Sequence, residues 1–372
     1  MKAIYIHIPF CSHICSYCDF YKMVAKEDLK NKYISYLIKE LNMKKEYMKE
    51  IETIYIGGGT PSSLTLDNIE KLLLAIKDNI DLSKVVEYTF EANPTDINEI
   101  LCNTLYKYGV NRISLGVQTL NQNKLKTLNR YHTKDIVKKA MKILKASGLT
   151  NINADIIYGV EPESFNLIKR DIRRLIRYGA THVSTYSLII EDKTIIKQKI
   201  DKGLFKPMDE AKEAKLYQKI CRYLKQKHFV HYEISNFSKK GYSSKHNLVY
   251  WNNQNYIGIG AGASFYIDNI RYTNIMNLNE YFEGIDNQKL NYLETTELTL
   301  DEQMAEEMIL GLRKLEGVNK NDFFNKYNIK IEDKYPFLSD LFLKGLVIND
   351  KDFLRVPEKA LYLINEVLVK FV

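Results

Sequence analysis

The chain has 372 residues, enough for one large domain and one smaller domain. Hydrophobic residues make up 45% and charged residues 27%, which is typical of a soluble globular protein and excludes disordered and membrane-spanning classes. The net charge of +8 is spread along the sequence with no long Lys/Arg block, so a solvated surface explains it better than binding of nucleic acid. The first residues lack the length and cleavage site of a signal peptide, and five cysteines do not form an obvious disulfide framework. We therefore expect a cytoplasmic protein.

Short β-rich runs alternate with longer runs of helical spacing up to about residue 190. The predicted strands are Ala3–Ile8, Thr53–Ile56, Tyr88–Glu91, Arg112–Val117, Asn151–Ile157 and His182–Ile189. The clearest helical runs between them are Lys30–Lys49, Thr65–Asn79, Lys134–Ala146 and Ser164–Tyr178. Such alternation predicts a parallel sheet with crossover helices. We expect an α/β fold built as an open six-stranded (β/α) partial TIM barrel, with a doubly wound open sheet as the alternative.

The pattern changes from about residue 290. A long helix is predicted over Asp209–Lys227, before this change. After it, Thr299 and Glu302 form a predicted capping box at the start of a further helix. Later helical runs and a hairpin over Gly345–Val356 predict a small winged-helix-like α+β domain. We therefore expect residues 1–290 to form the barrel with its extension and residues 291–372 to form the second domain. This tail has no basic recognition helix, so nucleic acid is not an expected partner.

Three of the five cysteines lie close together after the first predicted strand, as Cys11, Cys15 and Cys18. A [4Fe-4S] cubane normally takes four thiolates, so a loop that supplies three leaves one iron open. The open iron can chelate the amino and carboxylate groups of S-adenosylmethionine. The alternative is a zinc site, but zinc would want a fourth Cys or His at the usual spacing.

Polar residues collect where the predicted strands end. A glycine loop, Gly57-Gly58-Gly59, follows the second strand, and its backbone can approach a ligand closely. The other members of the set are Glu91, Gln118, Arg130 and Asp155. Polar groups on interior strands are costly unless they have partners, so the set predicts a ring around one pocket.

The CxxxCxxC spacing after a first strand resembles the radical S-adenosylmethionine superfamily. Tyr17 stands just before Cys18, where that superfamily usually has an aromatic residue. Further motifs resemble the oxygen-independent coproporphyrinogen III oxidase group, which contains a decarboxylating enzyme and the heme chaperones called HemW. These motifs are His7-Ile8-Pro9-Phe10-Cys11, Gly57-Gly58-Gly59-Thr60-Pro61, Gly116-Val117-Gln118, Asp155-Ile156-Ile157-Tyr158-Gly159 and Tyr232-Glu233-Ile234-Ser235-Asn236.

The resemblance implies a [4Fe-4S] cluster, S-adenosylmethionine and heme as cofactors. The residues it implies for cofactor binding are Tyr5, Tyr17, Gly57, Gly58, Glu91, Gln118, Arg130 and Asp155. Within this set Glu91 would hold the ribose, and Arg130 and Asp155 match positions that bind a second S-adenosylmethionine in the enzyme.

Two departures favour the chaperone branch over the enzyme. The oxidase typically has CxxxCxxCxC, and here Phe20 stands in place of the fourth cysteine; the oxidase also has a longer segment before its cluster. In contrast, His246-Asn247-Leu248-Val249-Tyr250-Trp251 matches HNxxYW, a motif that resembles HemW. On chemistry alone His246 fits a core histidine better, but the resemblance makes it the candidate heme ligand, in a site expected to be exposed.

The expected function is that of a heme chaperone rather than an enzyme. It would bind heme and pass it to heme-accepting proteins, with an electron donor such as flavodoxin or ferredoxin as a further partner. Membrane contact is expected only through an acceptor. The alternative is coproporphyrinogen III dehydrogenase, which would decarboxylate propionate side chains oxidatively.

Overall fold

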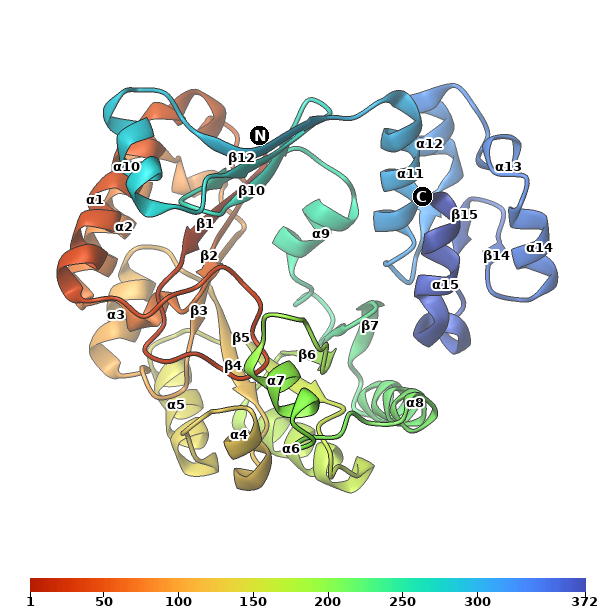
Figure 1. Cartoon of the computed structure of the whole chain (residues 1–372), viewed down its shortest axis with the longest axis horizontal. Helices are drawn as coiled ribbons and strands as arrows, with labels where there is room; N and C mark the ends of the chain where they lie inside the picture. The colour runs from red at the N-terminus through yellow and green to blue at the C-terminus, as the bar shows by residue number, and fades with distance from the viewer.

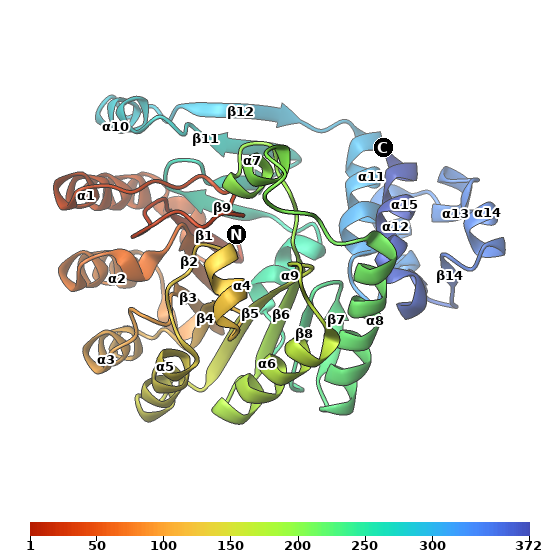
Figure 2. The ribbon, with the colours of Figure 1, turned by 60° about the horizontal axis from the view of Figure 1, so that its bottom comes forward.

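The structure is a computed structural model that describes all 372 residues. Six parallel strands form its centre in the order of the sequence: β1 (Ala3–Ile8), β2 (Thr53–Gly58), β3 (Glu87–Ala92), β4 (Arg112–Gln118), β5 (Asn151–Tyr158) and β6 (His182–Ser187). The crossover helices cover their outer side (Figure 2) and are α1 (Glu27–Met43), α2 (Leu66–Asn79), α3 (Glu99–Lys107), α5 (Lys134–Ala146) and α6 (Phe165–Tyr178). The predicted α/β fold is therefore confirmed.

The sheet continues beyond the six predicted strands at both edges. β9 (Tyr256–Ile259) pairs with β1 in parallel, and the antiparallel strands β10 (Ser264–Ile267), β11 (Ile270–Asn274) and β12 (Tyr292–Glu297) follow it. At the other edge β6 pairs with β8 (Asn236–Ser238), which pairs with β7 (Val230–Glu233). β12 and β7 end the sheet and do not pair with each other, so the barrel is open.

The crossover helices follow from local sequence. In α5 the Thr133 side chain accepts a hydrogen bond from the backbone N–H of Ile136 and caps the first turn. Val137, Ala140 and Leu144 lie on one face and are buried against the sheet, as the helical period predicts. The same arrangement repeats around the barrel and contributes to one core cluster of 78 buried residues.

The C-terminal part stands beside the barrel (Figure 1). Its elements are α11 (Leu300–Gly311), α12 (Lys320–Tyr327), α13 (Ile331–Lys334), α14 (Leu338–Leu343), α15 (Ile364–Leu368) and a small antiparallel sheet of β13 (Val318–Asn319), β14 (Ile348–Asn349) and β15 (Phe353–Arg355). The predicted capping box of Thr299 and Glu302 is present. The predicted hairpin is formed by β14 and β15. None of the helices is both long and apolar enough to cross a membrane.

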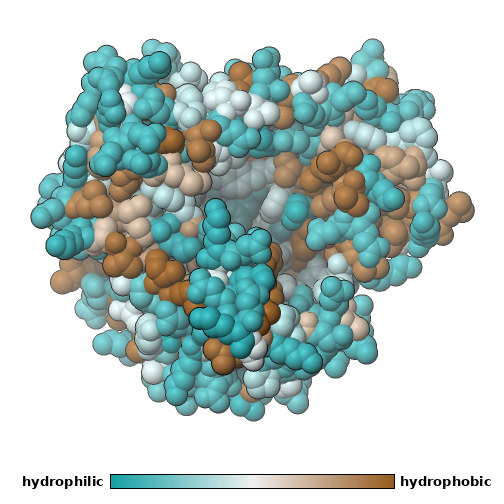
Figure 3. Space-filling view, in the orientation of Figure 1, coloured by the Kyte–Doolittle hydropathy of each residue, from teal (hydrophilic) through white to brown (hydrophobic).

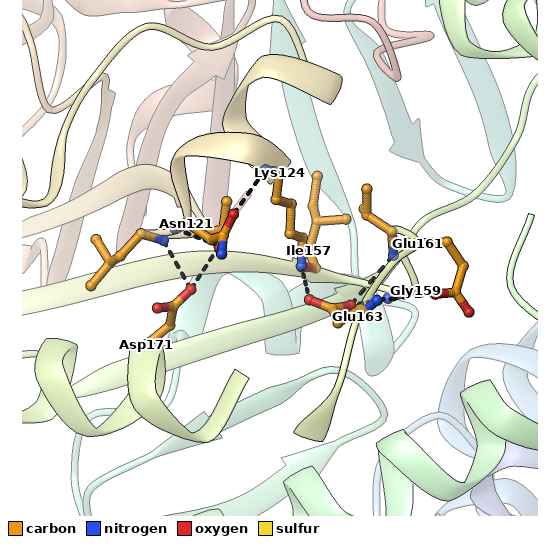
Figure 4. A network of polar contacts seen from close by, with 10 residues as sticks. Asn121, Lys124, Ile157, Gly159, Glu161, Glu163 and Asp171 are labelled. Carbon is orange, nitrogen blue, oxygen red and sulfur yellow. Dashed lines mark hydrogen bonds and ion pairs between the residues drawn. The ribbon is translucent and has the colours of Figure 1, made fainter. Parts of the chain in front are cut away.

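A buried polar network ties together the loops that follow β4 and β5 (Figure 4). Lys124, on α4 (Gln122–Thr127), forms an ion pair with Glu163, and both side chains are buried. The Glu163 carboxylate also accepts the backbone N–H of Gly159, at 2.7 Å. On the neighbouring side, Asp171 accepts from the Thr119 hydroxyl at 2.6 Å. The network therefore holds α4 against the ends of these two strands.

We expect Lys124→Met to lower the free energy of unfolding by about 3–5 kcal/mol, because it leaves the Glu163 carboxylate buried without its cation. The double variant with Glu163→Met should recover much of this loss, since it leaves no buried charge. The measurement is urea unfolding followed by circular dichroism. The matched control is Lys197→Met, which breaks the partly exposed pair with Asp201 and should cost no more than about 0.5 kcal/mol. Equal losses in Lys124→Met and the control would contradict this account.

Candidate functional site

A cavity of about 410 Å³ lies inside the open barrel. Its volume is in the range of small-molecule sites. The residues that line it come mainly from the cysteine loop, from β2 to β6 and from the segments that follow these strands. In the space-filling view, the face seen in Figure 1 is hollowed near its middle (Figure 3). All three cysteines of the motif lie on this one cavity, whereas Cys102 and Cys221 are buried elsewhere in the core.

The cysteine loop is fastened to the barrel by hydrogen bonds on either side of its cysteines. The backbone N–H of Cys11 donates to the carbonyl of Met23 at 2.9 Å. The Ser16 hydroxyl donates to the carbonyl of Thr127 at 2.7 Å, and the Asn129 amide donates to the carbonyl of Ile14 at 2.6 Å. Because Thr127 ends α4, the polar network of Figure 4 also supports the position of this loop.

The donor set of the loop fits a cubane cluster. Cys11, Cys15 and Cys18 are partly exposed free thiols that line the cavity. No group of three His, Cys, Asp or Glu side chains in the structure is arranged to hold a single metal ion. A [4Fe-4S] cluster takes one thiolate per iron, so its ligands need not converge on one point. Burial raises the pKa of the Cys15 thiol, but its hydrogen bond with His13 and the charge of Arg130 outweigh burial and lower that pKa overall.

Glu91 is held at the glycine loop. Its carboxylate accepts the Tyr55 hydroxyl at 2.5 Å and the backbone N–H of Gly58 at 3.2 Å. A Cβ atom on Gly57 would lie 2.8 Å from the Glu91 Cδ atom, so a side chain there would displace the carboxylate. Burial raises the pKa of Glu91 to about 7, although the hydrogen bond from Tyr55 lowers it.

Gln118 and Arg130 meet at a second glycine. A Cβ on Gly116 would lie 2.9 Å from Arg130 Nη2 and 3.3 Å from Gln118 Nε2. Arg130 also donates to the Asn93 amide oxygen at 2.7 Å. Gln118 has a φ of 61°, in the left-handed region that only a few non-glycine residues adopt, and the register between β4 and β5 shifts at this point. Backbone strain of this kind concentrates at binding and catalytic sites.

Asp155 faces the same cavity from β5. Its carboxylate accepts from the Asn153 amide at 2.8 Å and the Ser114 hydroxyl at 3.3 Å. Burial raises its pKa, and these hydrogen bonds oppose the rise. Gly58, Glu91, Gln118, Arg130 and Asp155 are thus brought together on one cavity with Tyr17.

Two predicted cofactor residues lie behind the cavity surface. Gly57 makes room for Glu91, as described above, and does not line the cavity. Tyr5 is turned toward His7, and its hydroxyl lies 2.9 Å from the His7 Nδ1 atom.

His246 lies at the opposite end of the barrel from the cysteine loop. It sits on α9 (Lys245–Trp251), and its Nδ1 atom is 2.9 Å from the hydroxyl of Thr53, the first residue of β2. Its Nε2 atom is 2.7 Å from the Tyr250 hydroxyl, and the side chain is fully buried. The expectation of an exposed histidine is therefore wrong. Both ring nitrogens already have partners, so binding of iron by His246 would require α9 to move.

Among the cavity residues that the sequence prediction missed are Arg112 and Asn247. Arg112 begins β4 and shares its inward face with Ser114, Gly116 and Gln118. This period-two alternation of small and polar residues was a readable signal of a cavity-facing strand. Asn247 belongs to the HNxxYW motif, but nothing in that motif indicates that the asparagine, rather than the histidine, lines the cavity.

Known proteins are similar to this chain over its whole length. The family model of the radical SAM superfamily matches residues 5–184, and that of the HemN C-terminal domain matches residues 298–363. The chain is 40% identical to the heme chaperone HemW of Lactococcus lactis, covering 100% of this chain and 97% of that protein. It is 37% identical to the heme chaperone HemW of Bacillus subtilis, and this match covers 100% of this chain and 99% of that protein. The chain belongs to the HemW family.

A solved structure shows the same fold at the level of the whole chain. Coproporphyrinogen III oxidase (HemN) from Escherichia coli, described as a radical SAM enzyme, superposes with a TM-score of 0.86. The match covers 100% of this chain and 90% of that one, at 20% sequence identity. This chain and HemN thus share one architecture.

We expect Glu91 to make stability fall as pH rises from about 5 to 8. Its folded pKa, about 7, lies above that of an unfolded glutamate, so between these two pKa values the unfolded state has lost the proton while the folded state keeps it, and stability falls as pH rises through this window. Relative to wild type, Glu91→Gln should therefore gain about 1–3 kcal/mol of unfolding free energy between pH 5 and pH 8. Urea unfolding at both pH values measures this, with Glu283→Gln, at an exposed position on α10 (Leu278–Asp286), as the control. A difference that does not change with pH would show that Glu91 is not buried as described.

Proposed function

We propose that this protein is a cytoplasmic heme chaperone, which binds heme and transfers it to heme-accepting proteins. The observation that carries the proposal is similarity to heme chaperones over the whole chain, together with Phe20 in place of the fourth cysteine of the oxidase motif. Heme-accepting proteins are the proposed partners, with a flavodoxin- or ferredoxin-like electron donor.

Cys11, Cys15 and Cys18 are the proposed ligands of a [4Fe-4S] cluster. When bound, the cluster supplies an open iron and an electron for S-adenosylmethionine. The support for this assignment is that the three thiols share a cavity with Tyr17, Arg130 and the other polar groups described above.

The cavity residues have distinct proposed tasks toward S-adenosylmethionine. Gly58 and Glu91 would hold the ribose and its surroundings, because the Glu91 carboxylate is fixed at the glycine loop with lone pairs still available. Gln118, Arg130 and Asp155 would hold the rest of the cofactor. Tyr5 and Gly57 would act indirectly. Tyr5 would hold His7 in place, and Gly57 would leave room for the Glu91 carboxylate.

The rim of the cavity supports heme as the cargo. Phe20, Tyr186 and Ile189 line the cavity and are 65%, 41% and 68% exposed. Large apolar side chains exposed together commonly mark a binding surface, and aromatic side chains suit a flat macrocycle. Lys22 lies on the same rim and could meet a propionate.

His246 is the proposed heme ligand on the strength of the HNxxYW motif, and its burial adds a condition. Burial lowers the pKa of His246 to about 3, so the imidazole is neutral and chemically able to bind iron. It must first exchange its contacts with Thr53 and Tyr250 for the iron, which requires α9 to leave the barrel end. Heme uptake and displacement of α9 are therefore coupled.

The test is a heme titration of the anaerobically reconstituted protein, followed at the Soret band, with cluster content checked in every variant. We expect wild type to take up heme stoichiometrically and His246→Ala to bind it about tenfold or more weakly, with a shifted band. Thr53→Val is the matched control, since it breaks the contact to His246 but keeps the imidazole. It should bind heme at least as tightly as wild type, because α9 is released more easily. Equal affinity for heme and equal spectra in His246→Ala and wild type would show that His246 is a core residue and not a heme ligand. Failure of wild type to bind heme would reject the proposed function.

A further inference from the structure

The helices α5 and α6 carry the positive excess of the whole protein. Together they hold ten Lys or Arg side chains and two Asp side chains, a net charge of +8 that equals the net charge of the full chain. Nine of the ten cations are exposed, and none forms an ion pair within the protein. In the sequence, apolar residues at helical spacing interrupt them, so no Lys/Arg block is visible. Folding collects them on two helices that lie side by side (Figure 1, Figure 2).

A hollow of about 480 Å³ at this face concentrates the charge next to α4. Lys134 of α5 and Arg170 and Arg174 of α6 line it, beside the residues that begin α4. Two carboxylates also lie there, but Asp171 is buried and already accepts from the Thr119 hydroxyl at 2.6 Å. The hollow therefore presents more positive than negative charge to the solvent.

Tyr131, which lies between α4 and α5, joins this face to the cysteine loop. Its side chain is 71% exposed, and its ring packs edge-on against that of His13, with 5.1 Å between the ring centroids. Its hydroxyl donates to the Asn129 amide oxygen at 2.5 Å, and the Asn129 amide donates to the Ile14 carbonyl, as described above. His13 is itself hydrogen-bonded to Cys15. An exposed aromatic side chain thus contacts the loop that carries the proposed cluster ligands.

The composition of this face selects among the possible partners. Of the large apolar side chains that are exposed in the structure, none lies on α5 or α6, so the two helices have nothing to insert into a lipid bilayer. They also offer no exposed aromatic rings on which nucleic-acid bases could stack. Exposed cations with one aromatic side chain at their edge fit a contact with an acidic protein, in which charges steer the encounter.

We propose that α5, α6 and Tyr131 form the docking surface for an acidic electron-carrier protein that reduces the cluster. The proposal rests on the function proposed above, which includes such a carrier, and names the surface that receives it. The carrier holds a reduced flavin or iron–sulfur centre; it is oxidised by one electron, and the cluster is reduced by that electron. Electron transfer through protein weakens steeply with distance, so a carrier over Tyr131 and His13 is well placed. The cations speed the encounter and orient the carrier.

The test measures binding of oxidised flavodoxin, an acidic flavoprotein, to the cluster-free and the reconstituted protein by calorimetry, at low and at moderate salt. The surface variant is Lys134→Glu with Arg170→Glu. The matched control is Lys77→Glu with Lys351→Glu, which changes the net charge equally at exposed positions on α2 and between β14 and β15. Anaerobic reduction of the cluster, by reduced flavodoxin and by a small chemical reductant, is followed in parallel.

We expect flavodoxin to bind wild type at low salt and to bind it more weakly as salt is added, because salt screens exposed charges. The surface variant should bind flavodoxin about tenfold or more weakly, the scale on which charge steering acts on association. Its cluster should be reduced more slowly by flavodoxin but at the wild-type rate by the small reductant, and the control should match wild type throughout. Lys134→Gln with Arg170→Gln, which removes the charges without reversing them, should lie between, and it carries the test if circular dichroism shows the Glu variant unfolded.

Equal affinity for flavodoxin in the surface variants and wild type overturns the proposal. Equal slowing of reduction by flavodoxin and by the small reductant also overturns it, because the defect then lies at the cluster and not at docking. Duplex DNA and vesicles of anionic phospholipid are titrated as competing partners, and binding of either through Lys134 and Arg170, without binding of flavodoxin, assigns the surface elsewhere. Failure of the heme chaperone function is a separate result, in which wild type binds flavodoxin through this surface but takes up no heme.

Discussion

The structure depends on keeping charged side chains inside an open barrel without pairing them with one another. Glu91, Arg112, Arg130 and Asp155 all line one cavity, and no ion pair joins any two of them. Each is held instead by neutral groups or by one bond to an amide. Removing charges from water in this way costs free energy that a simple core would avoid. The arrangement is what leaves these groups free to meet a ligand that carries charges of its own.

The two ends of the barrel are controlled by different parts of the chain. At one end, the Lys124–Glu163 network fixes α4, and α4 in turn holds the cysteine loop (Figure 4). At the other end, Glu87 caps α9, and His246 fastens that helix to β2. The cysteine motif and the HNxxYW motif therefore face each other across the barrel. A ligand that contacted both motifs would have to span the cavity. A ligand that bound His246 would have to displace α9 from this end of the barrel.

Much of this could be predicted from the sequence, because periodicity reports local structure well. β1 and α5 begin and end where the pattern placed them, and the capping box of Thr299 and Glu302 is present. The edge strands β7 to β12 were not predicted, because they are short and depend on pairing with strands far away in the sequence. The grouping of Glu91, Gln118, Arg130 and Asp155 was expected, since parallel strands end at the same edge.

The surroundings of His246 could not be predicted. Its partners Thr53 and Glu87 begin strands that lie far away in sequence, and nothing local to the motif shows that the histidine points into the core and the asparagine into the cavity. The same holds for Arg112, whose missing partner becomes visible only when every neighbouring carboxylate has been assigned. Motifs identify which residues matter, but burial and pairing decide what they can do.

The central claim is that this fold carries heme rather than decarboxylating a porphyrinogen. The most direct measurement incubates the reconstituted protein anaerobically with S-adenosylmethionine, a reductant and coproporphyrinogen III, beside a parallel sample loaded with heme and mixed with an apo heme protein. The account predicts no decarboxylated product in the first sample and stoichiometric transfer of heme to the acceptor in the second. Catalytic formation of decarboxylated product, with no transfer of heme, would contradict it.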